Sequence, residues 1–276
     1  MPLIKEWLED ATKQLADVGI ESAKLDAELI LAHTLRKPRT FIHAHDDIQL
    51  TTRQKEIADA RLYLRLDRTP LAYIIGHKEF YGRRFKVTPA TLIPRPESED
   101  FLAILETILP NTKALITDAP KRLLDVGTGS GILGITAKLE HPELDITLID
   151  ISRHALNVAR DNARTLHADI RILESDLLSK YDLLADIIVA NLPYVDVGWE
   201  RSPETNQEPP EALFAKDGGL YLIKKLVEQT SSKLRNGGYL LLEADLRQHN
   251  DIVRFAKNHG FTKRAIKGLI VSLQKD

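Results

Sequence analysis

The sequence predicts a small all-α bundle followed by an α/β domain with a doubly wound, mostly parallel sheet. From residue 3 to about 70, apolar residues recur at spacings near 3.6, the period of an α-helix. Beyond residue 97, short β-rich runs alternate with helical runs, which is typical of parallel strands joined by crossover helices. Only Lys267 and Gly268 separate the last two β-rich runs, so these predict a terminal antiparallel hairpin.

The chain has 276 residues, enough for one large domain or two modest ones. Turn and cap residues divide the helical part: Gly19 and Pro38 stand at breaks, and Ser22 and either Thr51 or Thr52 stand where helices begin. The next segment has aromatic and β-branched residues around Gly82 and ends in three prolines, which predicts a β-hairpin linker. The expected divisions are a helical domain at 1–75, the linker at 76–96 and the α/β domain at 97–276.

Seven runs of the α/β part have strand composition. They are Arg122–Val126, Asp145–Asp150, Ile170–Leu173, Asp186–Ala190, Tyr239–Glu243, Phe261–Ile266 and Leu269–Leu273.

Composition excludes several classes of site. Lys and Arg total 38 and Asp and Glu total 40, and the resulting charge of −2 argues against bulk binding of nucleic acid. The absence of cysteine excludes thiolate nucleophiles, cysteine-ligated zinc and disulfides, and the nine histidines show no zinc-ligand spacing, so no metal is expected. No apolar run reaches the roughly 18 residues of a membrane span, and the N-terminus lacks a signal peptide's apolar core. A cytoplasmic monomer is expected.

The strongest local motif is R-L-L-D-V-G-T-G-S-G at 122–131, a strand that runs into glycines and then into a helix. Glycines at 127, 129 and 131, with Thr128 and Ser130 between them, let the backbone turn sharply against a ligand. Asp150 ends the next strand, where its carboxylate can accept hydrogen bonds from both ribose hydroxyls of a nucleoside. Such a loop serves dinucleotides in one group of enzymes and S-adenosylmethionine in another. Its G-T-G-S-G spacing differs from the dinucleotide pattern G-x-G-x-x-G.

Three further residues are candidates for contact with the cofactor. Asp125, just before the glycines, is either a brace for the loop or a carboxylate that faces the cofactor's ammonium group. Asp176 and Leu177 follow the third strand, where Asp176 could accept from an adenine amino group and Leu177 could pack on the ring. The alternative is that these two form an ordinary surface turn.

The tetrapeptide N-L-P-Y, Asn191–Tyr194, follows the fourth strand, at the sheet edge where open α/β sheets bind ligands. A planar amide or amine nitrogen is weakly nucleophilic because its lone pair is delocalised. The Asn191 side-chain oxygen and the Leu192 carbonyl could accept its two hydrogens and favour pyramidalisation as a new bond forms. Pro193 would fix the backbone, and Tyr194 offers a ring face to the substrate.

Together, D-V-G-T-G-S-G, Asp150 and N-L-P-Y resemble class I methyltransferases that methylate a planar nitrogen. Two families compete. The small-rRNA adenine dimethyltransferases commonly carry N-L-P-Y, whereas the release-factor glutamine N5-methyltransferases typically carry N-P-P-Y, from which Leu192 departs.

The rest of the chain resembles the second family. The segment P-L-A-Y-I-I-G-H-K-E-F-Y-G-R-R-F-K-V-T-P-A-T-L-I-P-R-P-E-S-E at 70–99 is similar to its interdomain segment. E-P-P-E-A-L at 208–213 and D-G-G-L at 217–220 resemble its sequence downstream of the tetrapeptide. A helical domain that precedes the catalytic domain is also that family's arrangement. By this resemblance, the chain is identified as a member of the release-factor enzymes.

The resemblance implies a Rossmann-like class I fold, S-adenosylmethionine as cofactor, and Asn191, Leu192, Pro193 and Tyr194 as catalytic residues. Asn191 is expected to contact the cofactor as well. The resemblance also implies methyl transfer to the glutamine amide of the Gly-Gly-Gln motif in class I peptide-chain release factors, gripped by the N-terminal bundle, with no nucleic-acid substrate. The alternatives are an adenine N6-methyltransferase acting on RNA or DNA, a release-factor-binding adaptor with a relic pocket, and a dinucleotide oxidoreductase.

Overall fold

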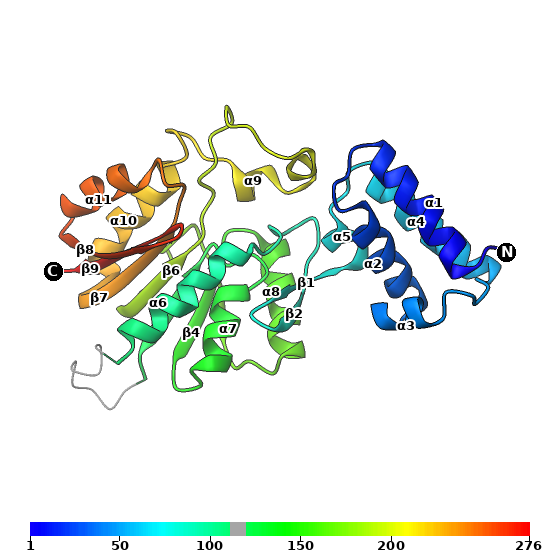
Figure 1. The fold of residues 1–276 in the computed structure, drawn as a ribbon. Coiled ribbons are helices and arrows are strands. Elements are labelled where there is room, and N and C mark those ends of the chain that lie inside the picture. The colour runs from blue at the N-terminus through cyan, green and yellow to red at the C-terminus, as the bar shows by residue number, and fades with distance from the viewer. Residues whose placement is uncertain (111–119) are drawn as a thin grey trace. The chain divides into compact units, whose positions relative to one another are not determined.

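The computed structural model describes residues 1–110 and 120–276, and the chain forms two compact units. The first unit comprises Met1–His77 and Arg201–Gln207, and the second comprises Lys78–Glu200 and Glu208–Asp276. Figure 1 follows the chain through both units and labels their helices and strands.

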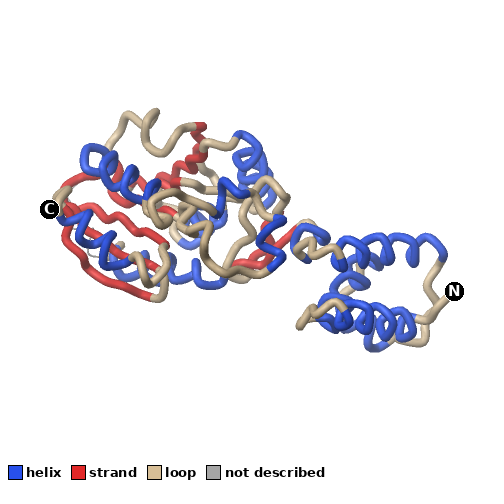
Figure 2. The backbone as a smooth tube through the Cα atoms, turned by 90° about the horizontal axis from the view of Figure 1, so that it is seen from above, coloured by secondary structure: helices blue, strands red, loops and turns tan. Residues whose placement is uncertain are grey.

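The first unit is helical, as the periodicity predicts, and Figure 2 shows its helices joined by loops. Thr51 accepts a hydrogen bond from the Gln54 backbone and so caps a helix as expected, whereas Ser22 stands at a cap position without such a bond. The unit's core is built from apolar side chains spaced along the helices, among them Ile4, Trp7, Leu15, Ile30, Leu31 and Leu62. The helices are α1 (Ile4–Asp17), α2 (Ala23–Leu35), α3 (Arg39–Ala44), α4 (Thr52–Leu66) and α5 (Leu71–Ile75).

A distant segment completes this unit. Residues 201–207, which include the 3-10 helix η3 (Pro203–Gln207), are held by Glu204. Its carboxylate pairs with Arg65 at 3.1 Å and with Arg68 at 3.2 Å, and Arg65 also pairs with the buried Asp26 at 2.6 Å. The sequence alone gave no sign that this segment belongs with the helices.

The segment after the helices begins with a two-stranded hairpin, β1 (His77–Phe80) and β2 (Arg83–Lys86). Tyr81 and Gly82 form its turn with φ values of 48° and 69°. The chain then runs without a regular element to η1 (Pro96–Glu99) and α6 (Asp100–Ile108).

The second unit contains a seven-stranded sheet in the order β5-β4-β3-β6-β7-β9-β8. Neighbouring pairs are parallel from β5 to β7, and β9 is antiparallel to both β7 and β8, so the expected fold class and terminal hairpin are confirmed. The strands are β3 (Arg122–Val126), β4 (Asp145–Asp150), β5 (Arg171–Glu174), β6 (Ala185–Ala190), β7 (Leu234–Glu243), β8 (Phe261–Lys267) and β9 (Ile270–Lys275).

Strand boundaries differ most from the sequence-based expectation at β7. It begins at Leu234 rather than Tyr239, because Leu234 pairs with Ala185 before the register shifts and Tyr239 pairs with Ile187. The extra residues form an irregularity around Gly237 and Gly238, which have no strand composition. The third strand runs to Glu174 rather than Leu173, because Glu174 pairs with Asp150.

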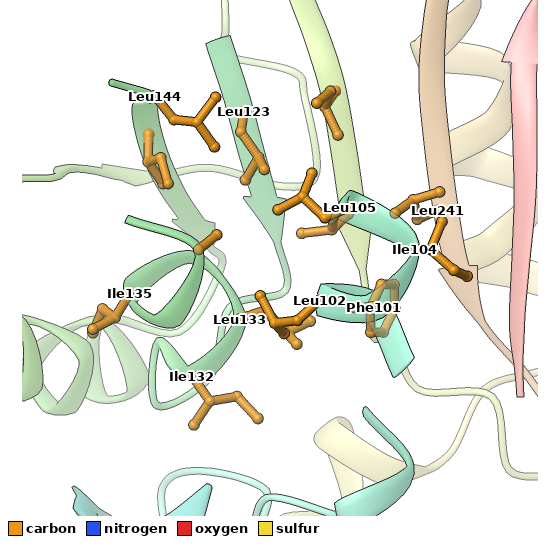
Figure 3. Close-up of a cluster of buried hydrophobic side chains, with 14 of the residues drawn as sticks. Phe101, Leu102, Ile104, Leu105, Leu123, Ile132, Leu133, Ile135, Leu144 and Leu241 are labelled. Carbon is orange, nitrogen blue, oxygen red and sulfur yellow. The ribbon is translucent and has the colours of Figure 1, made fainter. Parts of the chain in front are cut away.

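Alternate residues of the strands pack into two cores, one on each face of the sheet. Leu123 and Leu241 join the core formed with α6 and α7, and Figure 3 shows Phe101, Leu105 and Leu133 of these helices in that cluster. Leu124 and Val126 of β3 point to the opposite face and join the core formed with α10 and α11. The remaining helices are α7 (Ile132–Glu140), α8 (Arg153–Thr165), α9 (Pro210–Leu213), α10 (Tyr221–Lys233) and α11 (His249–Lys257).

Candidate active site

A cavity of about 300 Å³ lies in the second unit at the carboxyl ends of β3, β4, β5 and β6. β3 pairs with β4 on one side and with β6 on the other, and the chain connections diverge there, which is where open α/β sheets bind ligands. The expected site residues that line it are Asp125, Gly127, Thr128, Gly129, Ser130, Asp150, Asp176, Leu177, Asn191, Leu192 and Pro193.

The glycine loop meets the tetrapeptide directly. Gly127 has a φ of 72°, and a Cβ there would lie 2.7 Å from Cδ2 of Leu192, so only glycine fits without a shift. Gly131 does not line the cavity: it caps α7 with a φ of 84°, and a Cβ there would lie 2.7 Å from Cδ1 of Ile135. Gly131 therefore allows α7 to lie close to the sheet, and its contact with a cofactor stays a prediction.

Asp125 both braces the glycine loop and lines the cavity. Its Oδ2 accepts hydrogen bonds from Oγ1 of Thr128 at 2.7 Å and from the Gly134 backbone at 2.9 Å, which makes it a brace for the loop. It also lines the cavity. Burial raises the pKa of Asp125 to about 6, against these two hydrogen bonds, so its carboxylate is costly to keep charged without a cationic ligand.

Asp150 ends β4 and is fixed by backbone groups. Its Oδ2 accepts from the Gly129 nitrogen at 2.9 Å and its Oδ1 accepts from the Ser152 nitrogen at 2.8 Å. Burial raises the pKa of Asp150, while these hydrogen bonds oppose the rise. A carboxylate with lone pairs left beside the loop suits the two hydroxyls of a ribose.

The third strand contributes the pair at 176 and 177. Leu177 is buried, with a φ of 48°, and lines the cavity. Asp176 also lines the cavity, but its carboxylate forms an ion pair with Lys225 at 2.5 Å. An adenine amino group would therefore share this carboxylate with the lysine.

The four residues of the tetrapeptide do not all face the cavity. Asn191, Leu192 and Pro193 line the cavity, but Tyr194 does not. The Tyr194 hydroxyl donates to Oε1 of Glu243 at 3.2 Å, and its carbonyl accepts from the Gln248 side chain at 2.8 Å. Burial, followed by the charge of Glu243, raises the pKa of Tyr194, so the phenol stays protonated. The structure thus gives Tyr194 the role of an anchor for the tetrapeptide, and a contact between its ring and a substrate stays a prediction.

Several lining residues have no counterpart among the sequence-based candidates. Five linker residues form part of the wall, together with Pro209, Glu211 and Ala212; the five are Ala90, Thr91, Leu92, Pro94 and Arg95. Glu208 holds these two segments together, because its buried carboxylate accepts from the Ile93 backbone at 3.0 Å and pairs with Arg95. In the sequence, the only sign of this contact is a glutamate that precedes two prolines. Its partner Ile93 lies 115 residues away, so the pairing cannot be inferred from local sequence.

Residues 1–110 and 120–276 contain neither a membrane-spanning helix nor a metal-binding cluster. No helix in these ranges is both long and apolar enough to cross a membrane. Within the same ranges, no group of three or more His, Asp or Glu residues is arranged to hold a metal ion.

Comparisons with known proteins cover both units of the chain. The family model of the PrmC N-terminal domain matches residues 6–76, and the Methyltransferase small domain matches residues 105–208. A methyltransferase from Pyrococcus furiosus has a similar solved structure, with a TM-score of 0.51 and 17% identity over 78% of this chain and 95% of that one. This likeness supports the fold.

Curated relatives give the family. The release factor glutamine methyltransferase of Escherichia coli K12 is 38% identical over 249 residues, which span 87% of this chain and 84% of the relative. The protein of the same name from Coxiella burnetii is 36% identical over 264 residues, which span 94% and 91%. With similarity of this extent over both units, the chain belongs to the release factor glutamine methyltransferase family.

Proposed function

We propose that this protein transfers a methyl group from S-adenosylmethionine to the side-chain amide nitrogen of the glutamine in the Gly-Gly-Gln motif of class I release factors. The observation that carries the proposal is the meeting of the glycine loop with the tetrapeptide in one cavity. Val126 pairs with Ala190 in adjacent parallel strands, so the residues that follow each strand lie side by side.

The cavity fits the cofactor. When bound, S-adenosylmethionine supplies an electrophilic methyl group on a sulfonium ion. The buried Asp125 is suited to an ammonium group, and Asp150 is suited to a ribose. Leu177 offers an apolar wall, and the approach of Gly129 is open, because a Cβ at Gly129 would meet nothing within 4 Å.

The tetrapeptide would hold the nitrogen that is methylated. The Asn191 Oδ1 and the Leu192 carbonyl accept the two amide hydrogens, which weakens the delocalisation of the nitrogen lone pair. Pro193 limits the backbone that carries the Leu192 carbonyl. As the new carbon–nitrogen bond forms, the carbon–sulfur bond breaks, and the nitrogen then loses one proton to water. No strong base is required, because this proton becomes acidic only after transfer.

The departure of Leu192 from the family's proline is compatible with this role. Leu192 keeps its main-chain carbonyl, and its buried side chain packs against Gly127. The proposal further includes action in the cytoplasm as a monomer on a protein substrate rather than a nucleic acid, with the near-neutral net charge of −2 in support.

The test is methylation of a purified class I release factor by this protein and S-adenosylmethionine, followed by peptide mass spectrometry. The expected product is a Gly-Gly-Gln peptide whose mass is higher by that of one CH₂, because a methyl group replaces a hydrogen. A release factor whose motif glutamine is replaced by alanine should show no such increase. Methyl transfer to RNA or DNA under the same conditions, with no transfer to the release factor, would support the adenine alternative. Failure of S-adenosylmethionine to bind in calorimetry would point to an adaptor.

A further inference from the structure

Three polar side chains from distant parts of the chain form a hydrogen-bonded series beside the cavity. Asn191 follows β6 and Glu243 ends β7, and because Ala190 pairs with Leu242, both lie at the same edge of the sheet. Nδ2 of Asn191 donates to Oγ of Ser98 at 3.2 Å, and this hydroxyl donates to Oε2 of Glu243 at 2.6 Å. Ser98, from η1, is 0% exposed and Glu243 is 1% exposed.

The chemistry of the series permits one orientation of the Asn191 amide. A carboxylate only accepts hydrogen bonds, so Glu243 takes the single hydroxyl proton of Ser98. The Ser98 oxygen then has only lone pairs left for Asn191, which must present its NH₂ group. A half-turn of the amide would set Oδ1 against these lone pairs, and Oδ1 is thereby reserved for the cavity that Asn191 lines.

Glu243 also fixes the other end of the tetrapeptide. Its Oε1 accepts from the Tyr194 hydroxyl at 3.2 Å, so Ser98 and Tyr194 donate to different oxygens of the carboxylate. Burial raises the pKa of Glu243, and the hydrogen bonds from Ser98, Tyr194 and Asn191 oppose this rise by favouring the charged form. One buried carboxylate thus holds both Asn191 and Tyr194.

We propose that Ser98 and Glu243 are positioning residues that hold the Asn191 amide with its oxygen toward the hydrogens of the acceptor nitrogen. This inference rests on the proposed function. Neither residue needs to contact the substrate, because each acts through Asn191. The role is geometric: it removes the alternative amide orientation, in which an NH₂ group would face the NH₂ group of the substrate.

The kinetic test replaces Ser98 with alanine in the full chain. We expect kcat to fall about 10- to 100-fold, the scale of a misplaced catalytic group. The KM for the release factor and the Kd for S-adenosylmethionine should change little, because the cavity walls remain. Ser98→Thr keeps the hydroxyl and should restore most of kcat. Glu243→Gln can donate as well as accept, so it removes the one-way constraint and should lower kcat too.

Ser272→Ala is the matched control. Ser272 is also a buried serine, 1% exposed on β9, and its hydroxyl has no hydrogen-bond partner among the described residues. Ser272→Ala makes the same chemical change at a buried position of the second unit, outside the series, and kcat should stay at the wild-type value. Thermal unfolding of each variant separates a loss of kcat from a loss of folded protein.

A second measurement does not depend on turnover. In protein labelled with ¹⁵N-asparagine, hydrogen exchange of the Asn191 side-chain NH₂ reports its bond to Ser98. Exchange should be faster in Ser98→Ala and unchanged in Ser272→Ala. Wild-type exchange in Ser98→Ala, or wild-type kcat in that variant, would overturn the inference. Absence of methyl transfer by the wild-type protein would instead refute the proposed function, and the exchange measurement would still decide the positioning.

Discussion

Asp125 is a residue at which stability and ligand binding oppose each other. Burial lifts its pKa to about 6, above the ordinary 3.8, so the folded state favours the protonated form. The stabilising effect of this proton is complete below the ordinary pKa and is lost as the pH rises through about 6. At neutral pH the protein therefore carries a buried charge that lowers its stability.

Replacement of Asp125 by asparagine tests this opposition. The amide oxygen can still accept from Thr128 and Gly134, but the buried charge is gone. We expect the thermal midpoint at pH 7.5 to equal or exceed that of the wild type. The affinity for S-adenosylmethionine should fall about tenfold, or about 1.4 kcal/mol, because the ammonium group loses its counter-ion. Calorimetry checks both, and tighter binding by the variant would contradict the assignment.

The wild-type protein should show the corresponding pH dependence. Between pH 5 and pH 7 its affinity for the cofactor should rise as Asp125 ionises, with a midpoint near its pKa of about 6. The Asp125→Asn variant should show a flatter profile over the same range, apart from what Asp150 contributes. Calorimetric titration of both proteins with S-adenosylmethionine over this pH range tests the expectation. Parallel profiles would show that a group other than Asp125 causes the pH dependence.

In the proposed function, the side-chain oxygen of Asn191 accepts a hydrogen bond from the acceptor amide. We expect Asn191→Ala to lower kcat by about 100-fold or more, which is the scale of a lost transition-state hydrogen bond. Binding of S-adenosylmethionine should be largely intact, because Asp125, Asp150 and the glycine loop remain. Single-turnover methylation with calorimetry of cofactor binding measures both quantities, and activity within a few-fold of wild type would refute the acceptor role.

At the scale of elements, the site depends on how the β3 turn fits against the segment after β6. Gly127 and Leu192 are in close approach there, and Gly127 also has a positive φ. Gly82 offers a matched position: its φ is 69°, but a Cβ there would meet nothing within 4 Å. Substitutions at the two positions therefore separate backbone strain from contact.

Gly82→Ala should cost only the strain of a positive φ, about 1 kcal/mol in the free energy of unfolding. Gly127→Ala should cost more, because Leu192 must also move, and it should weaken both cofactor binding and turnover. Gly82→Ala should leave cofactor affinity unchanged. Chemical denaturation and calorimetry give the comparison, and equal effects of the two substitutions would show that the contact with Leu192 is unimportant.

At the scale of the whole molecule, the chain leaves the second unit after Glu200 and returns to it at Glu208. The residues between belong to the first unit, where Glu204 pairs with Arg65 and Arg68. Burial tends to raise the pKa of Glu204, but hydrogen bonds and these arginines outweigh it and hold the pKa below its ordinary value. The contribution of Glu204 to the stability of the fold is therefore present above the ordinary carboxyl pKa. It is lost as the pH falls through the lowered pKa of Glu204.

Glu204→Gln should release residues 201–207 from the helices. We expect faster amide hydrogen exchange in a peptide covering this segment at neutral pH, since an uncharged amide holds the two arginines less strongly. Glu200→Gln removes the same charge from the same loop at an exposed position and should leave the exchange rate unchanged. Equal protection in wild type and Glu204→Gln would mean that the ion pairs do not hold the segment.

The sequence by itself determined the succession of a helical bundle and a doubly wound sheet, because hydrophobic periodicity and turn residues act within a few positions of each other. It also located the glycine loop, Asp150 and the tetrapeptide, since residues that end parallel strands meet at one edge. The boundaries of β7 were less predictable, because pairing with β6 extends that strand through residues without strand composition.

Only the tertiary structure decided which distant groups complete the site. Ser98 and Glu243 are 145 residues apart, and their contact depends on the packing of η1 against the ends of β6 and β7. The same holds for Glu208 with Ile93, and for the anchoring of Tyr194, whose hydroxyl finds its partner on another strand. Local patterns identify the residues that end a strand, whereas register and packing choose the partners that fix their orientation.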